Sequence, residues 1–515
     1  MIDQAALNLG AALPATLLAF GAAILFVLDI SIPQERKART AWLAAVGVVV
    51  SLVISLLQIN QQETAFFGAF RADSFTSVAN IAALITALVG VIGAKDYLER
   101  AKIQRGEYYP LLLMTAAGAM FMAAANDLVI VLIALELLSI PLYVMVGFRR
   151  PEPRSEEGAM KYFLLGAFSS GFMVYGIALV YGAAGSTNFT EIFERVRFGE
   201  LLSPALMLIG IGLIFVSLGF KVAAVPFHLW TPDVYQGAPT PVTAYMSVAA
   251  KVGGFAALLR LLTVAIPTFA VGDLVIEPNQ TLIVHAAWQD LVAVIAALTM
   301  LLGNFVAIVQ KDLKRMLAYS SIAHAGYILM AVAAAGSFTV VANDFGDTTV
   351  TLTIAQEALQ GALIYLLAYA FTNVGAFAVV MCVEREDGSG TEINNIAGLG
   401  QINPLLGGAM TVFMLSLVGI PLTGGFVGKW FVFLSSVNAG LTLLALIGVL
   451  TSVVSAFYYL RIIVKMWFET GDFAPFAPRM LLLAIGFCVG GTVIVGVLPP
   501  VVTNLVQYVT AAALR

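Results

Sequence analysis

Long apolar runs alternate with short polar stretches along the whole chain. A run of about 20 apolar residues is long enough to cross a hydrocarbon core about 30 Å thick. A strand edge in lipid would leave backbone groups unpaired, so each run predicts a helix. The pattern therefore predicts an all-α polytopic membrane protein with fourteen transmembrane helices. Their expected limits are Leu13–Ile30, Trp42–Leu57, Phe75–Ala94, Tyr109–Ala125, Leu128–Phe148, Ala159–Gly182, Pro204–Trp230, Val242–Ile266, Ala287–Val309, Met316–Ala335, Leu359–Val383, Leu405–Val437, Leu441–Met466 and Met480–Leu498.

Two of these runs contain residues that interrupt a helix. The seventh reads GFKVAAVPFHLWTPD from Gly219 to Asp233, and the twelfth reads GIPLTGGFVGKW from Gly419 to Trp430. Proline removes a backbone donor and clashes with the preceding turn, and adjacent glycines weaken the helix further. We expect helices 7 and 12 to be broken near the middle of the membrane.

The two interrupted helices are five spans apart, which suggests an internal repeat. Helices 4–8 and helices 9–13 would form two five-helix units with opposite orientations, because five is odd. This is the geometry of inverted-repeat transporters, whose sites lie near the midplane at broken helices. The expected divisions are residues 1–108 for helices 1–3, 109–266 for the first repeat, 287–466 for the second and 467–515 for helix 14.

Composition supports the membrane assignment and narrows the class. Of 515 residues, 60% are hydrophobic and only 11% are charged, which is typical of a protein dissolved in lipid. The net charge of −4 argues against a surface that binds nucleic acid. The first ten residues carry an acid and no base, so we expect the first run to stay as a span and not to be cleaved. Cys382 and Cys488 lie in apolar runs without the spacing of a disulfide or metal framework, so we expect both to be packing residues.

The basic residues of the connectors predict the orientation of the spans. Bases gather after spans one, three, five and nine, which places these connectors inside and both termini outside. They are Arg36, Lys37, Arg39, Lys95, Arg100, Lys102, Arg105, Arg149, Arg150, Arg154, Lys311, Lys314 and Arg315. The connectors on the other side hold Arg71, Arg195 and Arg197 together with the acids Asp273, Glu277, Asp344 and Asp347.

Four charged residues lie deep within the apolar runs: Glu136, Lys221, Lys251 and Lys429. A charge near a bilayer centre costs roughly 2.5 to 3.5 kcal/mol on insertion scales and is by default a sign of an ion or proton path. Lys251 lies nine residues into its span, about 14 Å along the axis, too deep to reach the headgroups easily. Burial disfavours the charged form of a lysine, so such a group can exchange a proton near neutral pH. The alternative is a structural ion pair within the bundle.

Glu136, in ALELLSIP, has no basic partner within its own span, and we expect it to pair with Lys221 beside the first break. Such a pair would either switch the proton affinity of the lysine or act as a static contact. Lys429 is expected to be the counterpart of Lys221 in the second repeat. His324, in SSIAHAGY, could equally be a proton relay or a packed, hydrogen-bonded residue.

The remaining histidines, arginines and lysines in or near the spans indicate a proton path less clearly. His228 and His285 are expected to be structural or to lie at the surface, and Arg260 stays open. Lys161, Lys311 and Lys314 lie near the predicted membrane edges and are expected to be solvated.

The chain contains none of the motifs that would supply its own source of energy. It has no P-loop, no dinucleotide fingerprint, no CxxC, no histidine pair at helical spacing and no serine–histidine–acid arrangement that the spans could assemble. We therefore expect no redox centre and no nucleotide site in this chain. Transport would be driven by an ion gradient or by a partner.

The stretch FKVAAVPFHLWTPDVYQGAPTPVTAYMSVAAKVGGF, from Phe220 to Phe255, and the stretch QKDLKRMLAYSSIAHAGY resemble a known superfamily. They are similar to the antiporter-like, proton-translocating membrane subunits of respiratory complex I and to multisubunit cation/proton antiporters, over nearly the whole chain. A lysine at position 429, where the M-type family has glutamate, the modest length and the lack of a long lateral helix favour the N-type family, also called subunit 2, of NADH:quinone oxidoreductase.

This resemblance implies a translocase subunit in a bacterial cell membrane. Protons would pass Glu136, Lys221, Lys251 and Lys429, and the family adds weight to His324. The implied partners are antiporter-like and small membrane-arm subunits, with a peripheral arm that carries FMN and iron–sulfur clusters and uses NADH and quinone; this chain would bind no cofactor. As a mechanism, we expect protons to enter from the cytoplasm at the seventh-span break and to leave outside by way of Lys429.

Two alternatives remain open at this point. The chain could belong to a stand-alone sodium/proton antiporter, which would show sodium-dependent proton flux without NADH oxidation. It could also be a scaffold subunit whose buried charges only hold helices together.

Overall fold

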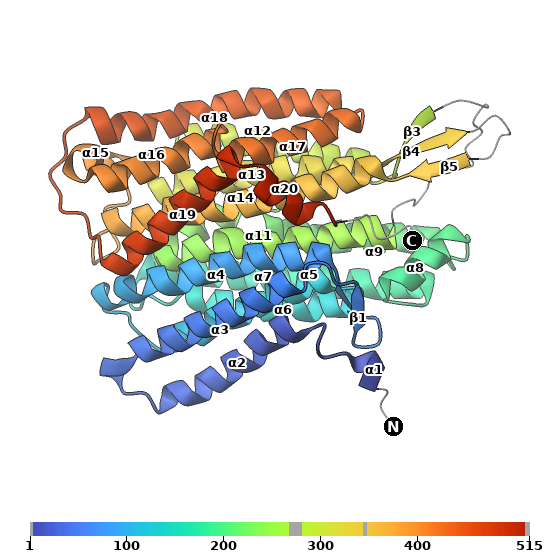
Figure 1. The fold of residues 1–515 in the computed structure, drawn as a ribbon, viewed down its shortest axis with the longest axis horizontal. Coiled ribbons are helices and arrows are strands. Elements are labelled where there is room, and N and C mark those ends of the chain that lie inside the picture. Colours follow the sequence, from blue (N-terminus) through green and yellow to red (C-terminus); the bar gives the residue numbers. More distant parts are fainter. Residues whose placement is uncertain (1–3, 267–280, 343–347, 510–515) are drawn as a thin grey trace.

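The protein is a bundle of long, roughly parallel helices (Figure 1). The structure is a computed structural model, and it describes residues 4–266, 281–342 and 348–509. All fourteen apolar runs are helical, as predicted. Among the described helices, twelve are long and apolar enough to cross a membrane, and α5 and α16 are shorter apolar helices. The spans are α2 (Leu13–Ile30), α3 (Ala38–Leu57), α4 (Ser74–Arg100), α5 (Tyr108–Ala124), α6 (Leu128–Val146), α7 (Pro153–Ala184), α9 (Pro204–Val222), α11 (Thr240–Arg260), α12 (Gln289–Ile308), α13 (Leu313–Ala334), α14 (Thr353–Val383), α16 (Pro404–Val418) with α17 (Gly424–Asn438), α18 (Thr442–Phe468) and α19 (Arg479–Val497).

Short elements lie at the two ends of the bundle. One end carries α1 (Gln4–Leu7), the hairpin of β1 (Glu63–Ala65) and β2 (Phe70–Ala72), α8 (Phe189–Arg197), and an antiparallel sheet in the order β3 (Thr281–His285), β4 (Ser337–Ala342), β5 (Thr348–Thr351). The small helix α15 (Leu399–Ile402) lies at the opposite end (Figure 1). The sequence analysis did not predict these strands, which lie in connectors between the spans.

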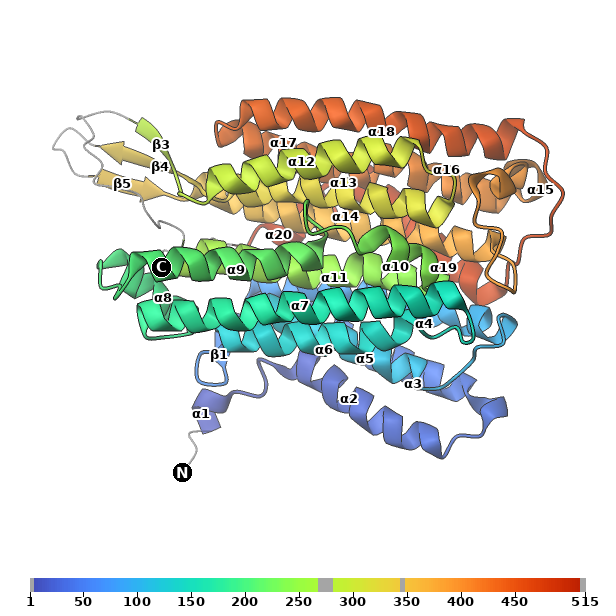
Figure 2. The ribbon, with the colours of Figure 1, turned by 180° about the vertical axis from the view of Figure 1, so that it is seen from behind.

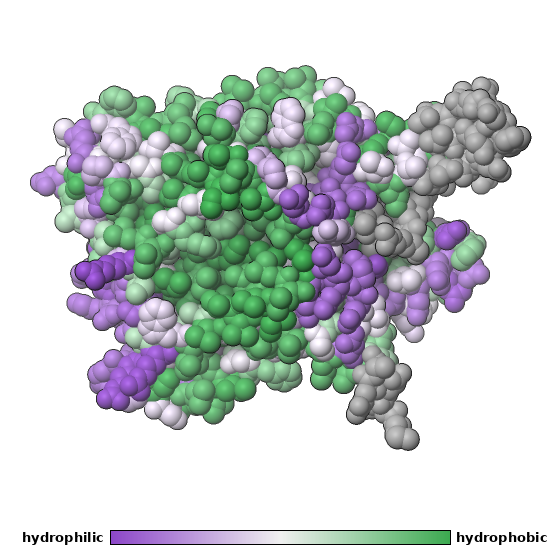
Figure 3. Space-filling view, viewed as in Figure 1, coloured by the Kyte–Doolittle hydropathy of each residue, from purple (hydrophilic) through white to green (hydrophobic). Residues whose placement is uncertain are grey.

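Five of the described helices form the interior, and the others surround them. Helices α11 and α14 are buried along nearly their whole length, and most residues of α4, α5 and α13 are buried as well. The outer helices α2, α3, α7, α18 and α19 expose many large apolar side chains. Figure 3 shows hydrophobic residues across the middle of one face and hydrophilic residues toward its two ends. This distribution is the one expected for a bundle that crosses a bilayer.

Both predicted breaks are present. Helix α9 ends at Val222, where Ala223 takes the left-handed conformation, and the chain becomes helical again only at α10 (Thr231–Gly237). Helix α16 ends at Val418, where Gly419 is also left-handed, and α17 begins at Gly424. Each break frees the last carbonyl groups of the helix before it, because no following turn donates to them.

The two lysines at the breaks do not occupy equivalent positions. Lys221 lies in the last turn of α9, before its break, whereas Lys429 lies in the second turn of α17, after its break. The two lysines therefore differ in their position relative to the break, and the expected role of Lys429 as the counterpart of Lys221 in the second repeat stays a prediction. The difference in position has a local reason: the lysine precedes Pro226 in the first motif and follows the Gly424–Gly425 pair in the second.

Two matching aspartate–threonine contacts, called clips below, favour the predicted repeat. Asp127 caps α6 and accepts a hydrogen bond from Thr187 Oγ1 at 2.8 Å; Asp312 caps α13 and accepts one from Thr391 Oγ1 at 2.5 Å. In both clips the amide after the aspartate donates to the carbonyl oxygen of the same threonine, at 2.9 and 2.7 Å. Helix α8 follows the first clip and α15 follows the second, and these helices lie at opposite ends of the bundle (Figures 1 and 2). The inverted repeat and its boundaries stay a prediction, which this pairing favours.

The predicted divisions extend in part beyond the described residues. The acids Asp273, Glu277, Asp344 and Asp347, used to predict the orientation, lie outside them.

Candidate functional site

The three deeply buried lysines have only neutral hydrogen-bond partners. Lys221, Lys251 and Lys429 are 3%, 2% and 4% exposed. Within the described ranges none of them has a carboxylate oxygen within 4.0 Å. The contacts therefore do not support the alternative of a structural ion pair. Hydroxyl and carbonyl oxygens can accept from an ammonium group and also from a neutral amine. Each lysine can therefore change its protonation state without leaving a carboxylate unpaired.

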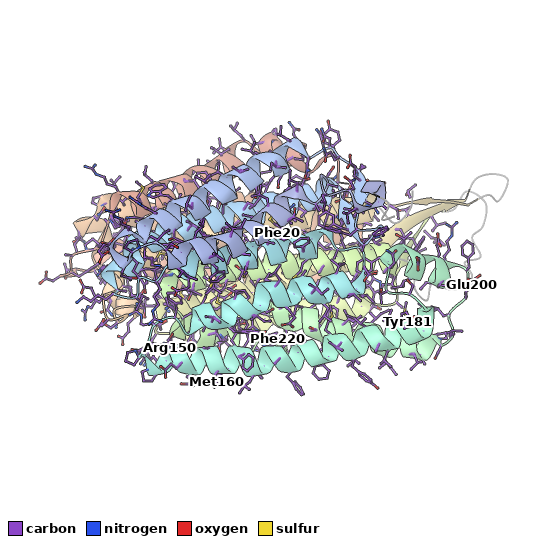
Figure 4. All side chains as sticks on the ribbon, turned by 90° about the horizontal axis from the view of Figure 1, so that it is seen from below. Phe20, Arg150, Met160, Tyr181, Glu200 and Phe220 are labelled. Atoms are coloured by element: carbon purple, nitrogen blue, oxygen red, sulfur yellow. The ribbon has the colours of Figure 1, made fainter. Side chains whose placement is uncertain are left out.

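Lys221 connects the first break to α6. Its Nζ donates to Ser139 Oγ at 2.8 Å and to Tyr162 OH at 3.2 Å, and lies 5.4 Å from the centre of the Tyr162 ring. Tyr162 in turn stacks on Trp230, at the end of the break, with ring centres 4.5 Å apart. Figure 4 shows that the neighbouring residue Phe220 lies along the bundle between Arg150 near one end and Glu200 near the other. Lys221, the next residue of α9, therefore also lies between the two ends of the bundle.

Glu136 does not contact Lys221 directly. The carboxylate is half-buried on α6 and accepts a hydrogen bond from Ser170 of α7. Ser139, the acceptor for Lys221, lies three residues later on α6, which is about one helical turn. The expected direct pair of Glu136 and Lys221 is therefore wrong. The ammonium group of Lys221 donates to the hydroxyl of Ser139, one turn away from the carboxylate.

Lys251 connects the two predicted repeats. Its Nζ donates to the carbonyl oxygens of Val222, the last residue of α9, at 3.1 Å and of Ser321, on α13, at 2.7 Å. The first of these carbonyls is free because the helix breaks there. Ser321 Oγ also lies 3.4 Å from Tyr235 OH, on α10.

His324 lies one turn after Ser321 and is bonded on both ring nitrogens. Nδ1 lies 2.6 Å from Tyr365 OH and Nε2 lies 3.1 Å from Tyr459 OH. A neutral imidazole donates from one nitrogen and accepts at the other, and tyrosine hydroxyls can do either. The arrangement fits the packed, hydrogen-bonded alternative and at the same time provides donors and acceptors for a relay.

A small cavity separates His324 from the second break. It has room for about one water molecule and is lined by residues that include Ser416, Gly425 and Gly428. The cavity therefore lies between His324 and the two helix ends, of α16 and α17, that flank the break.

Lys429 binds the end of the half-helix before the second break. Its Nζ donates to the carbonyl oxygens of Leu417 at 3.0 Å and Val418 at 2.8 Å, and to Ser452 Oγ at 2.7 Å. The ammonium group also lies 4.7 Å from the centre of the Tyr327 ring. The carbonyl end of a helix attracts positive charge, and coupling ions of transporters commonly lie at such ends.

The site residues thus form a row across the bundle, from Glu136 on α6 to Lys429 on α17. The sequence analysis found the charged members and His324 but missed the hydroxyl groups that connect them: Ser139, Ser170, Tyr162, Tyr365, Tyr459 and Ser452. A hydroxyl in an apolar run carries no charge signal. The spacing along the chain could have indicated Ser139. It follows the capping residue Asp127 by twelve positions, the same distance by which His324 follows the capping residue Asp312.

Arg260, left open by the sequence, lies in a buried hydrogen-bonded network. Its Nη2 donates to Asp73 Oδ1 and Thr76 Oγ1, both at 2.6 Å, and its Nε donates to the Ala123 carbonyl at 2.6 Å. These contacts join the end of α11 to α4 and α5.

Three other bases are placed as follows. His285 Nδ1 lies 3.1 Å from Ser337 Oγ, within the pair β3–β4, and His228 is buried between α9 and α10. Lys314 was expected to be solvated, but it is only 3% exposed, so that expectation is wrong. Among the residues of the three described segments, no group of three His, Cys, Asp or Glu side chains could hold a metal ion.

Comparison with known proteins assigns the fold and the family. The family model "NADH:quinone oxidoreductase/Mrp antiporter, TM" matches residues 125–345 and 342–455. NADH-quinone oxidoreductase subunit N of Trichlorobacter lovleyi is 41% identical over 97% of this chain and 96% of its own length. The chain belongs to the NADH-quinone oxidoreductase subunit N family.

Solved structures agree with this assignment. A chain of respiratory complex I from Thermus thermophilus is 32% identical, with a TM-score of 0.76 over 95% of this chain and 98% of its own. A chain of the Mrp complex from Dietzia sp. has the same fold, with a TM-score of 0.79 over 98% of this chain and 97% of its own, at only 18% identity. The subunit N family is therefore the better match for the chain, as the resemblance of its motifs indicated.

Proposed function

We propose that this chain is the proton-translocating membrane-arm subunit of an NADH:quinone oxidoreductase. The observation that carries the proposal is the row of buried lysines without carboxylate partners, next to two broken helices, in a chain of the subunit N family. A lysine held only by neutral oxygens is poised to release and regain a proton. The chain acts as part of a translocase, and the energy comes from quinone reduction in other subunits.

The proposed path follows the row of residues across the bundle. Protons enter at the first break, where Lys221 and Ser139 meet, and Glu136 alters the proton affinity of this region through its charge. Lys251 carries the proton across the boundary between the repeats, because it bonds to α9 on one side and α13 on the other. His324, with its two tyrosines, delivers it toward Lys429, from which it leaves.

Internal water would complete the steps that direct contacts do not cover. Successive site residues lie on different helices, and direct hydrogen bonds do not join all of them. One such interval contains the cavity beside His324. Water molecules with two or more polar partners can bridge such gaps.

The orientation is proposed from the connectors. Bases gather after α2, α4, α6 and α12, and Arg150, after α6, lies near the opposite end of the bundle from Glu200 (Figure 4). We place the basic end in the cytoplasm and both termini on the outer side of a bacterial cell membrane.

The partners follow from the family. They are the neighbouring antiporter-like and small membrane-arm subunits and, through the complex, the peripheral arm. FMN, iron–sulfur clusters, NADH and quinone belong to those other subunits.

Proton pumping in inverted membrane vesicles tests the proposal. Lys221→Ala, Lys251→Ala and Lys429→Ala are compared with Lys311→Ala, an exposed lysine outside the row. Each is scored as protons moved per assembled complex during NADH oxidation. Normal pumping in the three row variants would exclude the path.

The same vesicles separate the other candidate functions. An antiporter subunit would show sodium-dependent proton flux without NADH oxidation. A scaffold subunit would show less assembled complex but unchanged pumping per complex.

A further inference from the structure

The short helix α10 is the second half of the first broken helix, and it lies between the two predicted repeats. Figure 2 shows it beyond the end of α9 at the break. It packs against α7 on one side and α13 on the other. Having only seven residues, it cannot hold its own position by backbone hydrogen bonding alone. Side-chain contacts must therefore fix where it lies.

The first turn of α13 supplies a clamp for α10 from the second repeat. Arg315 Nη1 donates to Asp233 Oδ1 at 2.6 Å and to Gln236 Oε1 at 3.3 Å. Lys314 Nζ donates to the carbonyl oxygen of Ala238, directly after α10, at 2.6 Å. Two adjacent bases thus hold the helix near its start and at its end.

The two contacts differ in environment. Arg315 and Asp233 have side chains that are 30% and 35% exposed, and an exposed pair of this kind contributes little stability. Lys314 is buried, and a buried ammonium group is costly unless it has partners. Neither contact is therefore explained by a large gain in stability. We infer that both bases serve to fix the position of α10.

The same helix that clamps α10 also carries part of the proposed path. Ser321, about two turns after Arg315, accepts from Lys251 through its carbonyl oxygen. Its hydroxyl lies 3.4 Å from the hydroxyl of Tyr235, in the middle of α10. His324 follows one turn later. A displacement of α10 relative to α13 would therefore act on the surroundings of Lys251.

We propose that Lys314 and Arg315 are positioning residues that hold α10 against α13, so that the first break and the Lys251–Ser321 contact move as one unit. This inference rests on the proposed proton path. Neither base carries the proton in this arrangement. They fix the half-helix on which the entry side of the path depends.

Hydrogen exchange of the assembled complex measures the clamp directly. In the double variant Lys314→Met/Arg315→Gln, the amides of residues 231–240 should exchange at least about tenfold faster, because two charge-assisted contacts are lost. Pumping per assembled complex should fall in the same variant. The pair Lys314→Arg/Arg315→Lys should restore both readouts, since the donors return. Lys311→Ala, on the connector just before α13 and exposed, is the matched control and should alter neither.

The outcomes separate this inference from the proposed function. Unchanged exchange in the double variant, or faster exchange with normal pumping, overturns the clamp as a positioning device. Lys251→Ala in the same preparation tests the path itself: if it pumps normally, the proposed function fails whatever α10 does. Loss of pumping in Lys251→Ala together with normal pumping in the clamp variant leaves the path and rejects the clamp.

Discussion

The ammonium group of Lys251 lies 3.1 Å from the carbonyl oxygen of Val222, the residue at which α9 ends. Lys429 makes the equivalent contact at the second break, with the carbonyl oxygen of Val418 at 2.8 Å. In both places the break frees a carbonyl oxygen, and the lysine that takes it comes from a different helical segment. The breaks and the buried lysines are thus parts of one arrangement.

Replacing Lys251 by arginine should not preserve transport. Arginine keeps the charge and can reach a carbonyl oxygen, but it does not release its proton in proteins. We expect Lys251→Arg to assemble and to lose pumping by about 10²-fold or more, as expected for removal of a proton-transfer group. Proton flux in vesicles, normalised to assembled complex, measures this. Pumping close to that of the unchanged protein would show that Lys251 serves only as a fixed charge.

Removing the hydroxyl of Ser139 should weaken the connection between Lys221 and α6. Ser139→Ala deletes the acceptor at 2.8 Å and leaves Tyr162 OH, at 3.2 Å, as the remaining partner. The loss of one hydrogen bond to a charged group is worth roughly 1.5 to 3 kcal/mol, so we expect pumping to fall by about tenfold or more. Ser139→Thr keeps a hydroxyl and is the control. Equal rates in the two variants would contradict the link.

The two tyrosines of His324 can be tested separately. Tyr365→Phe removes the partner of Nδ1, and Tyr459→Phe removes the partner of Nε2. If His324 relays protons, each change should lower pumping, because a relay needs both nitrogens. If His324 is only a packed residue, the variants should lower the thermal midpoint of the complex and leave pumping per complex unchanged. Proton flux and thermal unfolding of the same preparations decide between these.

Arg260 should behave differently from the lysines of the row. Its pair with Asp73 is buried, and breaking a buried pair by removing one partner costs about 3 to 5 kcal/mol. We expect Arg260→Gln to reduce the amount of assembled complex strongly, with normal pumping by the complexes that form. Quantifying assembled complex in native gels alongside flux measures both. The double change Arg260→Gln/Asp73→Asn should recover part of the assembly, because the buried carboxylate that lost Arg260 is then neutral; Arg71, the second partner of Asp73, is 24% exposed and keeps contact with water.

The sequence predicted the spans more fully than the contacts. All fourteen helices and both breaks were predicted, because lipid allows no other backbone arrangement for long apolar runs and because proline and paired glycines interrupt helices locally. The strands β3, β4 and β5 were missed, since these runs of four to six residues are too short to span a membrane and lie in connectors where no membrane constraint applies. The burial of Lys314 was missed for a related reason: a base near a predicted membrane edge looks solvated until a neighbouring segment such as α10 covers it.

The sequence by itself determined the class of protein, the positions of the buried charges and the family that its motifs resemble, since these depend on residue type and on spacing along one chain. The tertiary structure alone decided which groups meet: Lys221 with Ser139 instead of Glu136, Lys251 with the freed end of α9, and Lys429 with the freed end of α16. Such contacts join helices that are far apart in the chain. One helical turn separates a carboxylate from a hydroxyl, and only packing between helices determines which of the two a lysine reaches.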